Sequence, residues 1–280
     1  MIEIKNLTKK FDDFTAVDDL SLTIKTGEFF GLLGPNGAGK TTTISMLSTL
    51  LLPTQGEILI DGERLTRKRP ALKRKISVIT QEYSMRQDMN MDEIMEYQGR
   101  LYFMPRKQIK ERTEELLEFC DLLKFRKRTV RKLSGGMKRK LMVCRALLTD
   151  PEILLLDEPT AGMDALSRRQ MWNLLRKLNE KNLTILLTTH YMEEAQSLCN
   201  RVALMDHGKL EEVSTPSALI ESLGAYAVDE MTADGTQNHY FHTRQEAIRY
   251  LEELTGQASL RETTLEDVFV ERAGKHLISK

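Results

Sequence analysis

The sequence has few cysteines, no excess of either charge and little aromatic content. Its 280 residues hold 41 Lys and Arg against 41 Asp and Glu, so the formal net charge is zero. Proteins that bind nucleic acid usually carry a basic bias, and none is present. The three cysteines, Cys120, Cys144 and Cys199, stand far apart with no CxxC or other metal-ligand spacing. This composition predicts a cytoplasmic enzyme with three buried thiols in a reducing compartment.

Long hydrophobic runs are missing as well. The longest, at 153–156 and 183–187, have the length of a buried strand, whereas a membrane-spanning helix needs about 20 apolar residues. The first six residues, MIEIKN, lack the basic segment and apolar run of a secretory signal. If the protein serves a membrane, we expect the spanning part in another chain.

The remaining 41% of apolar residues are enough for a packed core, and their pattern predicts an α/β fold. Short strands and helices alternate along the chain, which favours a mostly parallel sheet, with an antiparallel part from the N-terminus and the segment after Gly56. Expected strands are 2–6, 20–25, 28–33, 56–60, 76–80, 153–157 and 184–189, and expected helices are 41–51, 91–103, 107–124 and 134–149.

The pattern of predicted strands and helices changes after about residue 215. Two strand-like segments, 227–231 and 237–241, precede two amphipathic helices at 245–254 and 264–273. We therefore expect a main domain over 1–215, with a helical subdomain at about 82–150, and a small α+β extension over 216–280.

Residues 34–41 read GPNGAGKT and fit G-x-x-x-x-G-K-[ST] between an expected strand and an expected helix. Glycines let successive backbone N–H groups point at one anion, and the following helix adds its positive end. Lys40 is expected on the β- and γ-phosphates, and the Thr41 hydroxyl on Mg²⁺. The alternative is a glycine-rich turn that occurs by chance. The predicted phosphate-binding residues are Gly34, Pro35, Asn36, Gly37, Ala38, Gly39, Lys40, Thr41 and Thr42.

Two adjacent carboxylates, Asp157 and Glu158, follow the apolar run at 153–156. A carboxylate at the end of a buried strand can face the phosphate loop, so Asp157 is expected to hold Mg²⁺ directly or through water. Glu158 points elsewhere and is the candidate that orients and polarises an attacking water. On their own, the two residues would more simply be a solvated turn.

A second anion-binding pattern, LSGGM at 133–137, opens the expected helix at 134–149. Ser134, Gly135 and Gly136 supply a cap hydroxyl and free amides at a helix N-terminus. One chain therefore carries two sites suited to a polyphosphate.

With these motifs in this order, residues 1–215 resemble the nucleotide-binding subunit of an ATP-binding-cassette (ABC) transporter. The resemblance implies a P-loop NTPase fold, an ATPase activity with ATP and Mg²⁺, and a homodimer or heterodimer of cassettes. In this family the LSGGM-like signature covers the γ-phosphate bound in the opposite subunit. A separate polytopic membrane subunit, a location at the cytoplasmic face of the membrane and no nucleic-acid partner are also implied.

The resemblance assigns five further residues. Gln81 corresponds to a glutamine that contacts Mg²⁺ or water, His190 to a switch histidine on the γ-phosphate, and Asp164 to a loop that crosses the dimer interface. Phe11 corresponds to an aromatic side chain that stacks on adenine, and Val17 lies near the same base. Taken singly, Gln81 would be a polar strand end, His190 a structural histidine and Phe11 a core residue.

Some positions depart from the family pattern. Met137 replaces a common Gln, Ala161 and Met163 replace Ser and Leu in the interface loop, and Phe11 replaces Tyr. No catalytic group is lost, so these changes concern the geometry of the interface. Met137, together with TLEDVFVER at 264–272, is similar to subunits of exporters of drugs, antibiotics, ions, lipids or polysaccharides.

The methionine-rich segment 83–104 begins at Tyr83 and directly follows Glu82, and it has two interpretations. The resemblance implies a groove that receives a short helix of the membrane subunit, and the alternative is a helical core stripe. Two other functions are alternatives to transport. A soluble cassette protein acting on ribosomes or DNA usually has two cassettes or a long coiled coil, and neither is present. A kinase or GTPase would leave LSGGM and His190 unexplained.

Overall fold

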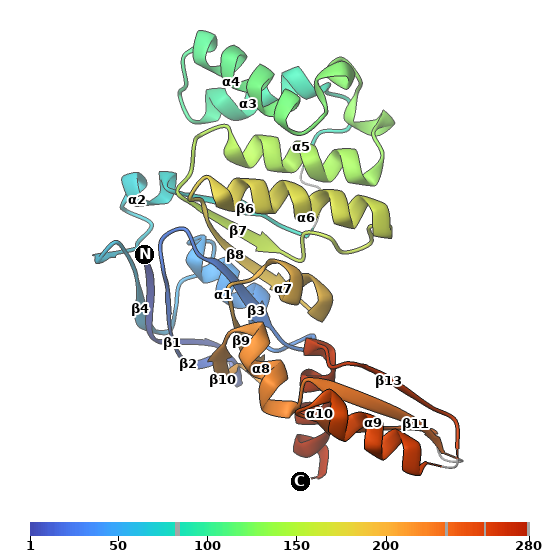
Figure 1. Cartoon of the computed structure of the whole chain (residues 1–280). Helices are drawn as coiled ribbons and strands as arrows, with labels where there is room; N and C mark the ends of the chain where they lie inside the picture. Colours follow the sequence, from blue (N-terminus) through green and yellow to red (C-terminus); the bar gives the residue numbers. More distant parts are fainter. Residues whose placement is uncertain (82–84, 233–234, 255, 279–280) are drawn as a thin grey trace. The chain divides into compact units, whose positions relative to one another are not determined.

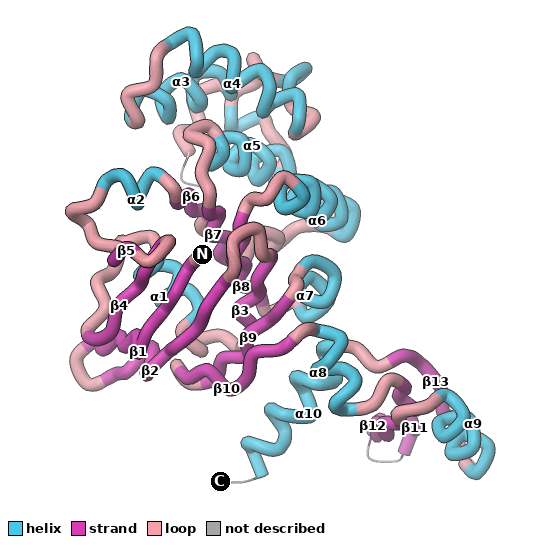
Figure 2. The backbone as a smooth tube through the Cα atoms, turned by 60° about the vertical axis from the view of Figure 1, so that its left-hand side comes forward, coloured by secondary structure: helices cyan, strands magenta, loops and turns pink. Residues whose placement is uncertain are grey.

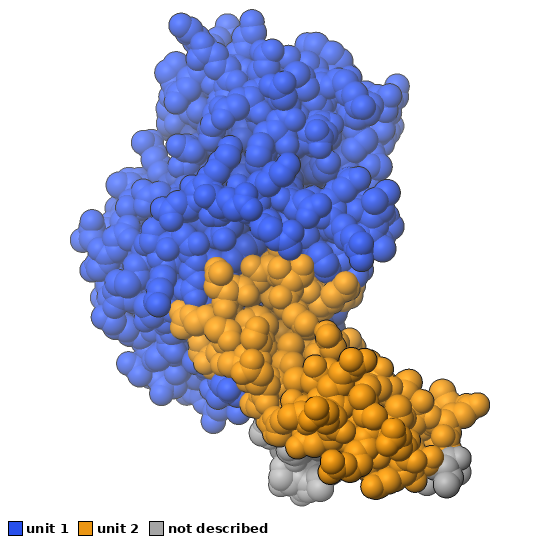
Figure 3. Space-filling view, viewed as in Figure 1, with its two compact units in different colours: residues 1–190, 203–212 blue, residues 191–202, 213–280 orange. Residues whose placement is uncertain are grey.

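The computed structural model describes residues 1–81, 85–232, 235–254 and 256–278, and groups them into two compact units (Figure 3). Unit 1 comprises residues 1–190 and 203–212, and unit 2 comprises residues 191–202 and 213–280. The functional division expected at residue 215 stays a prediction. Among the described residues, no helix is long and apolar enough to cross a bilayer.

Unit 1 is built on two sheets, which Figures 1 and 2 show with their helices. A six-stranded sheet has the order β10-β9-β3-β8-β7-β6, and a four-stranded antiparallel sheet has the order β2-β1-β4-β5. The strands are β1 (Ile2–Phe11), β2 (Phe14–Ile24), β3 (Phe29–Leu33), β4 (Gln55–Ile60), β5 (Glu63–Arg64), β6 (Ile76–Ile79), β7 (Ile153–Asp157), β8 (Thr184–Thr189), β9 (Arg201–Asp206) and β10 (Lys209–Ser214).

The middle of the six-stranded sheet is parallel, as the continuous apolar runs predict. Strands β3, β8, β7 and β6 pair in parallel, and every residue of β3, β7 and β8 is buried. Strands buried on both faces are typical of a sheet with helices on each side. The P-loop NTPase α/β architecture is thereby confirmed.

Helices α1, α2 and α5 pack on this sheet, and α3 and α4 join α5 in a helical part (Figure 1). Helix α1 packs against β7 of one sheet and β2 of the other, while α3, α4 and α5 pack on one another. The helices are α1 (Lys40–Leu47), α2 (Pro70–Arg74), α3 (Met91–Leu101), α4 (Arg106–Phe119), α5 (Gly135–Leu147) and α6 (Ala165–Glu180), with 3₁₀ turns η1 (Leu123–Phe125) and η2 (Val130–Lys132).

The predicted helix 107–124 is wrong at its C-terminal end. Helix α4 stops at Phe119, and Asp121 has a left-handed backbone (φ 59°), after which a separate 3₁₀ turn begins. A residue with positive φ cannot continue an α-helix, although the apolar spacing continues past it. The sequence pattern therefore joined two elements that the backbone separates.

Strands β1 and β2 are longer than the predicted segments 2–6 and 20–25. They form one hairpin from Ile2 to Ile24 around Asp12 and Asp13, with register shifts at three places along β1. Each bulge shifts the alternation of buried and exposed residues by one. A period-of-two pattern consequently found only the outer halves of this hairpin.

Unit 2 contains the predicted α+β extension. Its sheet has the order β12-β11-β13 and is antiparallel, with α9 packed on it. Helix α10 packs on α7 and α8 of the same unit. The elements are α7 (Met192–Leu198), α8 (Pro216–Leu223), β11 (Tyr226–Thr232), β12 (Gly235–Phe241), α9 (Arg244–Glu253), β13 (Ala258–Glu262) and α10 (Leu265–Ile278).

An ion-pair cluster centred on Arg261 stabilises unit 2. The guanidinium donates to Asp229 on β11 at 2.7 Å and to both carboxylate oxygens of Asp267 in α10 at 2.7 and 2.8 Å. Asp267 also accepts from the backbone and hydroxyl of Thr264, at the start of α10. One arginine thus joins two strands to the first turn of the last helix.

Candidate active site

The candidate site lies where three neighbouring parallel strands end. Leu33 at the end of β3 is opposite Thr189 on β8, and Asp157 at the end of β7 is opposite Thr188. Because parallel strands place their carboxyl ends at one edge of a sheet, the loops that follow β3, β7 and β8 meet there. The predicted phosphate loop, the carboxylate pair and His190 are brought together in this way.

The phosphate loop follows β3 and ends at Gly39, the N-cap of α1. Gly37 and Gly39 have positive φ angles of 84° and 96°. A Cβ atom on Gly39 would lie 2.4 Å from the carbonyl oxygen of Ala16, so the loop passes too close to β2 for any side chain. Glycine is required there by backbone conformation and by space.

Lys40 is buried and folds over the loop. Its Nζ donates to the carbonyl oxygens of Gly34 at 2.8 Å and Pro35 at 2.9 Å. Burial lowers the pKa of the Lys40 ammonium, an effect that the nearby charges of Glu158 and Asp157 oppose. The loop therefore holds its ammonium group close to the backbone that would surround an anion.

Asp157 and Thr41 place a carboxylate oxygen and a hydroxyl oxygen side by side where the loop meets α1. The Thr41 hydroxyl donates to Asp157 Oδ1 at 3.1 Å, and the Thr188 hydroxyl donates to the same oxygen. Among the described residues there is no group of three His, Cys, Asp or Glu side chains that could enclose a metal. A hydroxyl and one carboxylate nevertheless fit Mg²⁺, which is usually held by one or two protein oxygens together with substrate phosphates.

Glu158 combines a left-handed backbone with a side chain that contacts His190. Its φ is 47°, and its N–H donates to the carbonyl oxygen of Thr188 at 3.0 Å. Its Oε1 lies 3.0 Å from Nδ1 of His190. The Glu158 side chain is 14% exposed and that of His190 is 38% exposed. The carboxylate is thus held at the edge of the site, where it can still reach water.

A cleft of about 550 Å³ runs across these groups. It is lined by Phe14, Ala16, residues 36–42, Gln81, Glu158, Ala161 and His190. Gln81, placed after β6, therefore faces the same space as the phosphate loop. Sequence reasoning missed Phe14 and Ala16, because it predicted this strand only at 20–25 and gave no signal that residues 14–16 lie beside the loop.

The two predicted base-binding residues, Phe11 and Val17, differ in exposure and in what they contact. Phe11 is 41% exposed and lies under the Lys9 ammonium, 4.9 Å from the ring centroid. Its direct partner across the hairpin, Phe14, is 62% exposed and lines the cleft. Val17 is fully buried, in the contact that β2 makes with Gly39. The roles of Phe11 and Val17 stay predictions.

The signature residues line a different hollow. Ser134 is the N-cap of α5, and its hydroxyl accepts the Met137 N–H at 3.2 Å. Ser134, Gly136 and Met137 face a hollow of about 550 Å³ that α6 also borders, through Ser167. In the described part of the chain, this hollow and the phosphate cleft have no lining residue in common.

Asp164 lies beside the signature as the N-cap of α6. Its carboxylate accepts from the Ser167 hydroxyl at 2.7 Å and from the Ser167 N–H at 2.8 Å. These bonds lower the pKa of Asp164. Gly136 packs closely here, since a Cβ on it would lie 3.2 Å from Ser167 Oγ. The loop that ends in Asp164 and the signature are therefore built as one surface.

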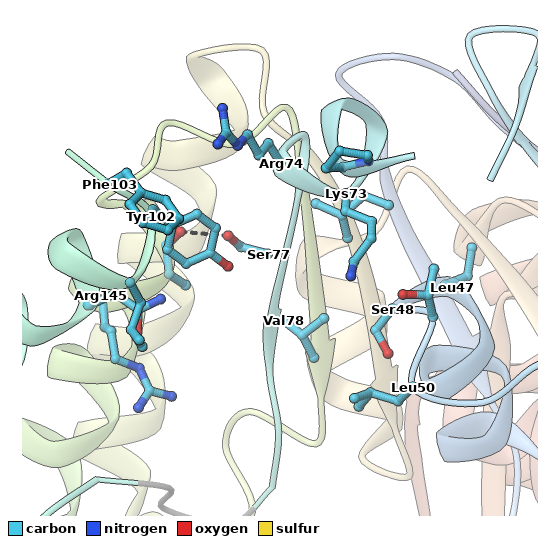
Figure 4. A pocket seen from close by; sticks show the side chains of 16 residues that line it. Leu47, Ser48, Leu50, Lys73, Arg74, Ser77, Val78, Tyr102, Phe103 and Arg145 are labelled. Carbon is cyan, nitrogen blue, oxygen red and sulfur yellow. Dashed lines mark hydrogen bonds between the residues drawn. The ribbon is translucent and has the colours of Figure 1, made fainter. Parts of the chain in front are cut away.

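A third depression, of about 470 Å³, lies between the sheet and the helical part (Figure 4). Tyr102 and Phe103 border it on one side and Lys73, Arg74 and Val78 on the other, as Figure 4 shows. Phe103 is 88% exposed.

The methionines of this region are mostly core residues. Met85, Met91 and Met95 are buried, which agrees with the core stripe rather than with a methionine-lined groove. The exposed apolar side chains are instead Tyr97, Leu101 and Phe103. Glu82 and Tyr83 lie outside the described residues.

Fold and site together define a P-loop nucleoside triphosphatase. The family model described as "ABC transporter" matches residues 17–161. A "Nod factor export ATP-binding protein I" from Cupriavidus metallidurans is 36% identical over 299 aligned positions, covering 99% of this chain and 98% of that protein. The "Linearmycin resistance ATP-binding protein LnrL" of Bacillus subtilis is 36% identical over 235 positions, covering 84% of this chain and 76% of that protein.

Solved structures agree with these relatives. A dimeric ATP-binding cassette in a post-hydrolysis state with ADP and Pi is 29% identical, with a TM-score of 0.68, covering 77% of this chain and 98% of the other. The chain belongs to the ABC transporter family. It is an ATP-binding subunit and an ATPase.

Proposed function

We propose that the chain drives an exporter as one of two cassettes that share their ATP sites. The separation of the phosphate cleft from the signature hollow carries this proposal. The phosphate cleft and the signature hollow of one chain face different spaces. The phosphate cleft of one chain can therefore be completed by the signature of a second chain. The dimeric solved cassette supports the same arrangement.

In the proposed reaction, backbone N–H groups of residues 36–42 and the Lys40 ammonium bind the triphosphate, and an aromatic side chain at Phe11 stacks on the base. Ser134 and the amides of Gly135 and Gly136 from the second chain close over the γ-phosphate. Phosphoryl transfer then depends on positioning and charge stabilisation rather than on covalent chemistry.

Glu158 accepts the proton of the attacking water, and His190 holds the carboxylate through the 3.0 Å contact. Gln81 lines the same cleft and positions the water. Thr41 and Asp157 would hold Mg²⁺, with Gln81 nearby; when bound, this ion neutralises charge on the phosphate oxygens. Loss of phosphate removes the charge that drew the two chains together, and the dimer opens.

The proposed partner in the membrane docks in the depression of Figure 4. Its wall combines the exposed ring of Phe103 and the half-buried ring of Tyr102 with the cations of Lys73, Arg74 and Arg145. A short amphipathic segment with an apolar face and at least one carboxylate fits this surface. The chain itself would then lie at the cytoplasmic face of the membrane.

Export rather than import is supported by the relatives, whose names refer to Nod factor export and to linearmycin resistance. Those cargoes belong to the relatives. For this chain the proposal covers direction only, because cargo is selected in the membrane subunit. The segment 216–280 is proposed as an accessory domain of the cassette.

Co-purification tests the proposal. The tagged chain is expressed with the neighbouring reading frames and solubilised from membranes, and bound proteins are identified by mass spectrometry. A polytopic membrane protein in a complex with two cassettes, with ATPase activity, is the expected result. A chain that hydrolyses ATP in solution and never associates with membranes would contradict the transport role.

A further inference from the structure

One arginine of the signature helix is almost completely enclosed. Arg139, in α5, is 1% exposed and is among the largest fully buried side chains. Arginine stays protonated in proteins, so its burial is unfavourable unless its N–H groups find acceptors.

Arg139 reaches backbone carbonyl groups at or next to candidate active-site residues. Its Nη1 donates to the carbonyl oxygen of Thr80 at 2.8 Å, and its Nη2 to that of Gln81 at 3.2 Å. The same Nη2 lies 3.5 Å from the carbonyl oxygen of Glu158, a longer contact at the limit of a hydrogen bond. One guanidinium therefore spans two backbone segments that carry candidate catalytic side chains.

We propose that Arg139 is a positioning residue that fixes Gln81 and Glu158 relative to the signature helix. This inference rests on the proposed roles of those two residues. Arg139 lines none of the phosphate cleft, so it acts through the backbone rather than on the nucleotide. It lies five residues after Ser134, the N-cap of the same helix, or about 7.5 Å along the helix axis.

The planar fork of arginine suits this task. Its two Nη atoms reach two successive carbonyl oxygens, Thr80 and Gln81, in one fixed geometry. A lysine keeps the charge but has a single nitrogen and cannot reproduce the fork. Arg139→Lys consequently tests positioning while it leaves the buried charge in place.

The experiment compares Arg139→Lys with a matched exchange elsewhere in the helical part. Arg126 is a part-buried arginine that binds both carboxylate oxygens of Asp92, at 2.9 and 3.1 Å, and it lines neither the phosphate cleft nor the signature hollow. We expect Arg139→Lys to lower kcat about 10- to 100-fold, because a misplacement of about 1 Å costs on that order. The Kd for ATP is expected to change less than threefold, about 0.7 kcal/mol.

Arg126→Lys should leave kcat unchanged and lower only the melting temperature. If Arg139→Lys keeps kcat within twofold of the wild type, or if Arg126→Lys loses as much activity, the inference is overturned. Arg139→Met, which removes every donor, is a second variant, and circular dichroism shows whether it folds. If Arg139→Met does not fold, the conservative variant Arg139→Lys still tests the inference.

A double-mutant cycle with Gln81→Ala separates positioning from general destabilisation. If Arg139 acts through the Gln81 segment, the double variant loses less activity than the product of the two single losses. A multiplicative loss would contradict the inference. The proposed function is judged separately: absence of hydrolysis in the wild type refutes it, whereas hydrolysis that Glu158→Gln removes and Arg139→Lys spares refutes only the role of Arg139.

Discussion

Replacing Glu158 by Gln tests the assignment of the general base most directly. The exchange preserves the shape of a side chain that is only 14% exposed and keeps a hydrogen-bonding atom within reach of His190 Nδ1. It removes the negative charge and the ability to accept a proton. The left-handed backbone of Glu158, with φ at 47°, is compatible with either residue.

The expected magnitude follows from the role. General-base catalysis contributes about 10²- to 10⁴-fold to a rate. At about 1.36 kcal/mol for each factor of ten, this corresponds to about 3–5 kcal/mol of lost transition-state stabilisation. ATP binding depends on the loop amides and Lys40, so we expect its Kd to stay within a few-fold of the wild-type value. An ATP-bound dimer that cannot hydrolyse should accumulate.

Two assays measure these outcomes. Phosphate release under saturating ATP and Mg²⁺ gives kcat, and size-exclusion chromatography with ATP gives the fraction of dimer. Glu158→Asp serves as the control, because it keeps a carboxylate but shortens its reach. A Glu158→Gln protein that hydrolyses ATP at more than a third of the wild-type rate would refute the assignment.

Three further predictions concern binding, stability and docking. Lys40→Ala should weaken ATP binding at least tenfold, because the buried ammonium on the loop is lost; isothermal titration with ATP checks this, and an unchanged Kd would contradict the cradle. Arg261→Met should lower the free energy of unfolding of unit 2 by about 1–3 kcal/mol, seen in urea denaturation, since its charged hydrogen bonds to Asp267 disappear. Burial raises the pKa of Asp267, but hydrogen bonds from Arg261 and Thr264 outweigh the effect of burial, so the pKa is lowered. The stabilisation by Asp267 is therefore present above the usual carboxyl pKa and is lost as the pH falls through the lowered pKa. An Arg261→Met variant that unfolds in acid like the wild type would disprove this pH dependence. Phe103→Asp should fold normally, since the ring is 88% exposed, yet reduce recovery of the membrane subunit by pull-down, whereas Val270→Asp on unit 2 should not.

The sequence predicted the parts of the site that are continuous in the chain. The loop at 34–41, the carboxylates after β7 and the signature each combine a fixed residue order with a strand or helix boundary, so local chemistry identified them. The parallel core strands β3, β7 and β8 were also predicted from the sequence, because strands buried on both faces give unbroken apolar runs.

What sequence reasoning missed depends on contacts between distant segments. Phe14 and Ala16 line the cleft only because a bulged hairpin carries them beside the loop. Arg139 reads as one more cation in the sequence KRK, and only packing shows that its neighbours Lys138 and Lys140 are more exposed than it is. The methionines of 83–104 left a docking groove and a core stripe open, and only the burial of Met91 and Met95 decides for the core stripe. Such outcomes follow from tertiary packing, which periodicity alone does not encode.

The left-handed backbone at Glu158 sets folding against activity at one position. A residue with a Cβ atom pays about 1–2 kcal/mol in that region, whereas glycine would not. The bond from the Glu158 N–H to Thr188 keeps the turn in place despite this strain. A glycine here would relax the turn and abolish the base, so selection for a more heat-resistant protein and selection for a working one would choose different residues at position 158.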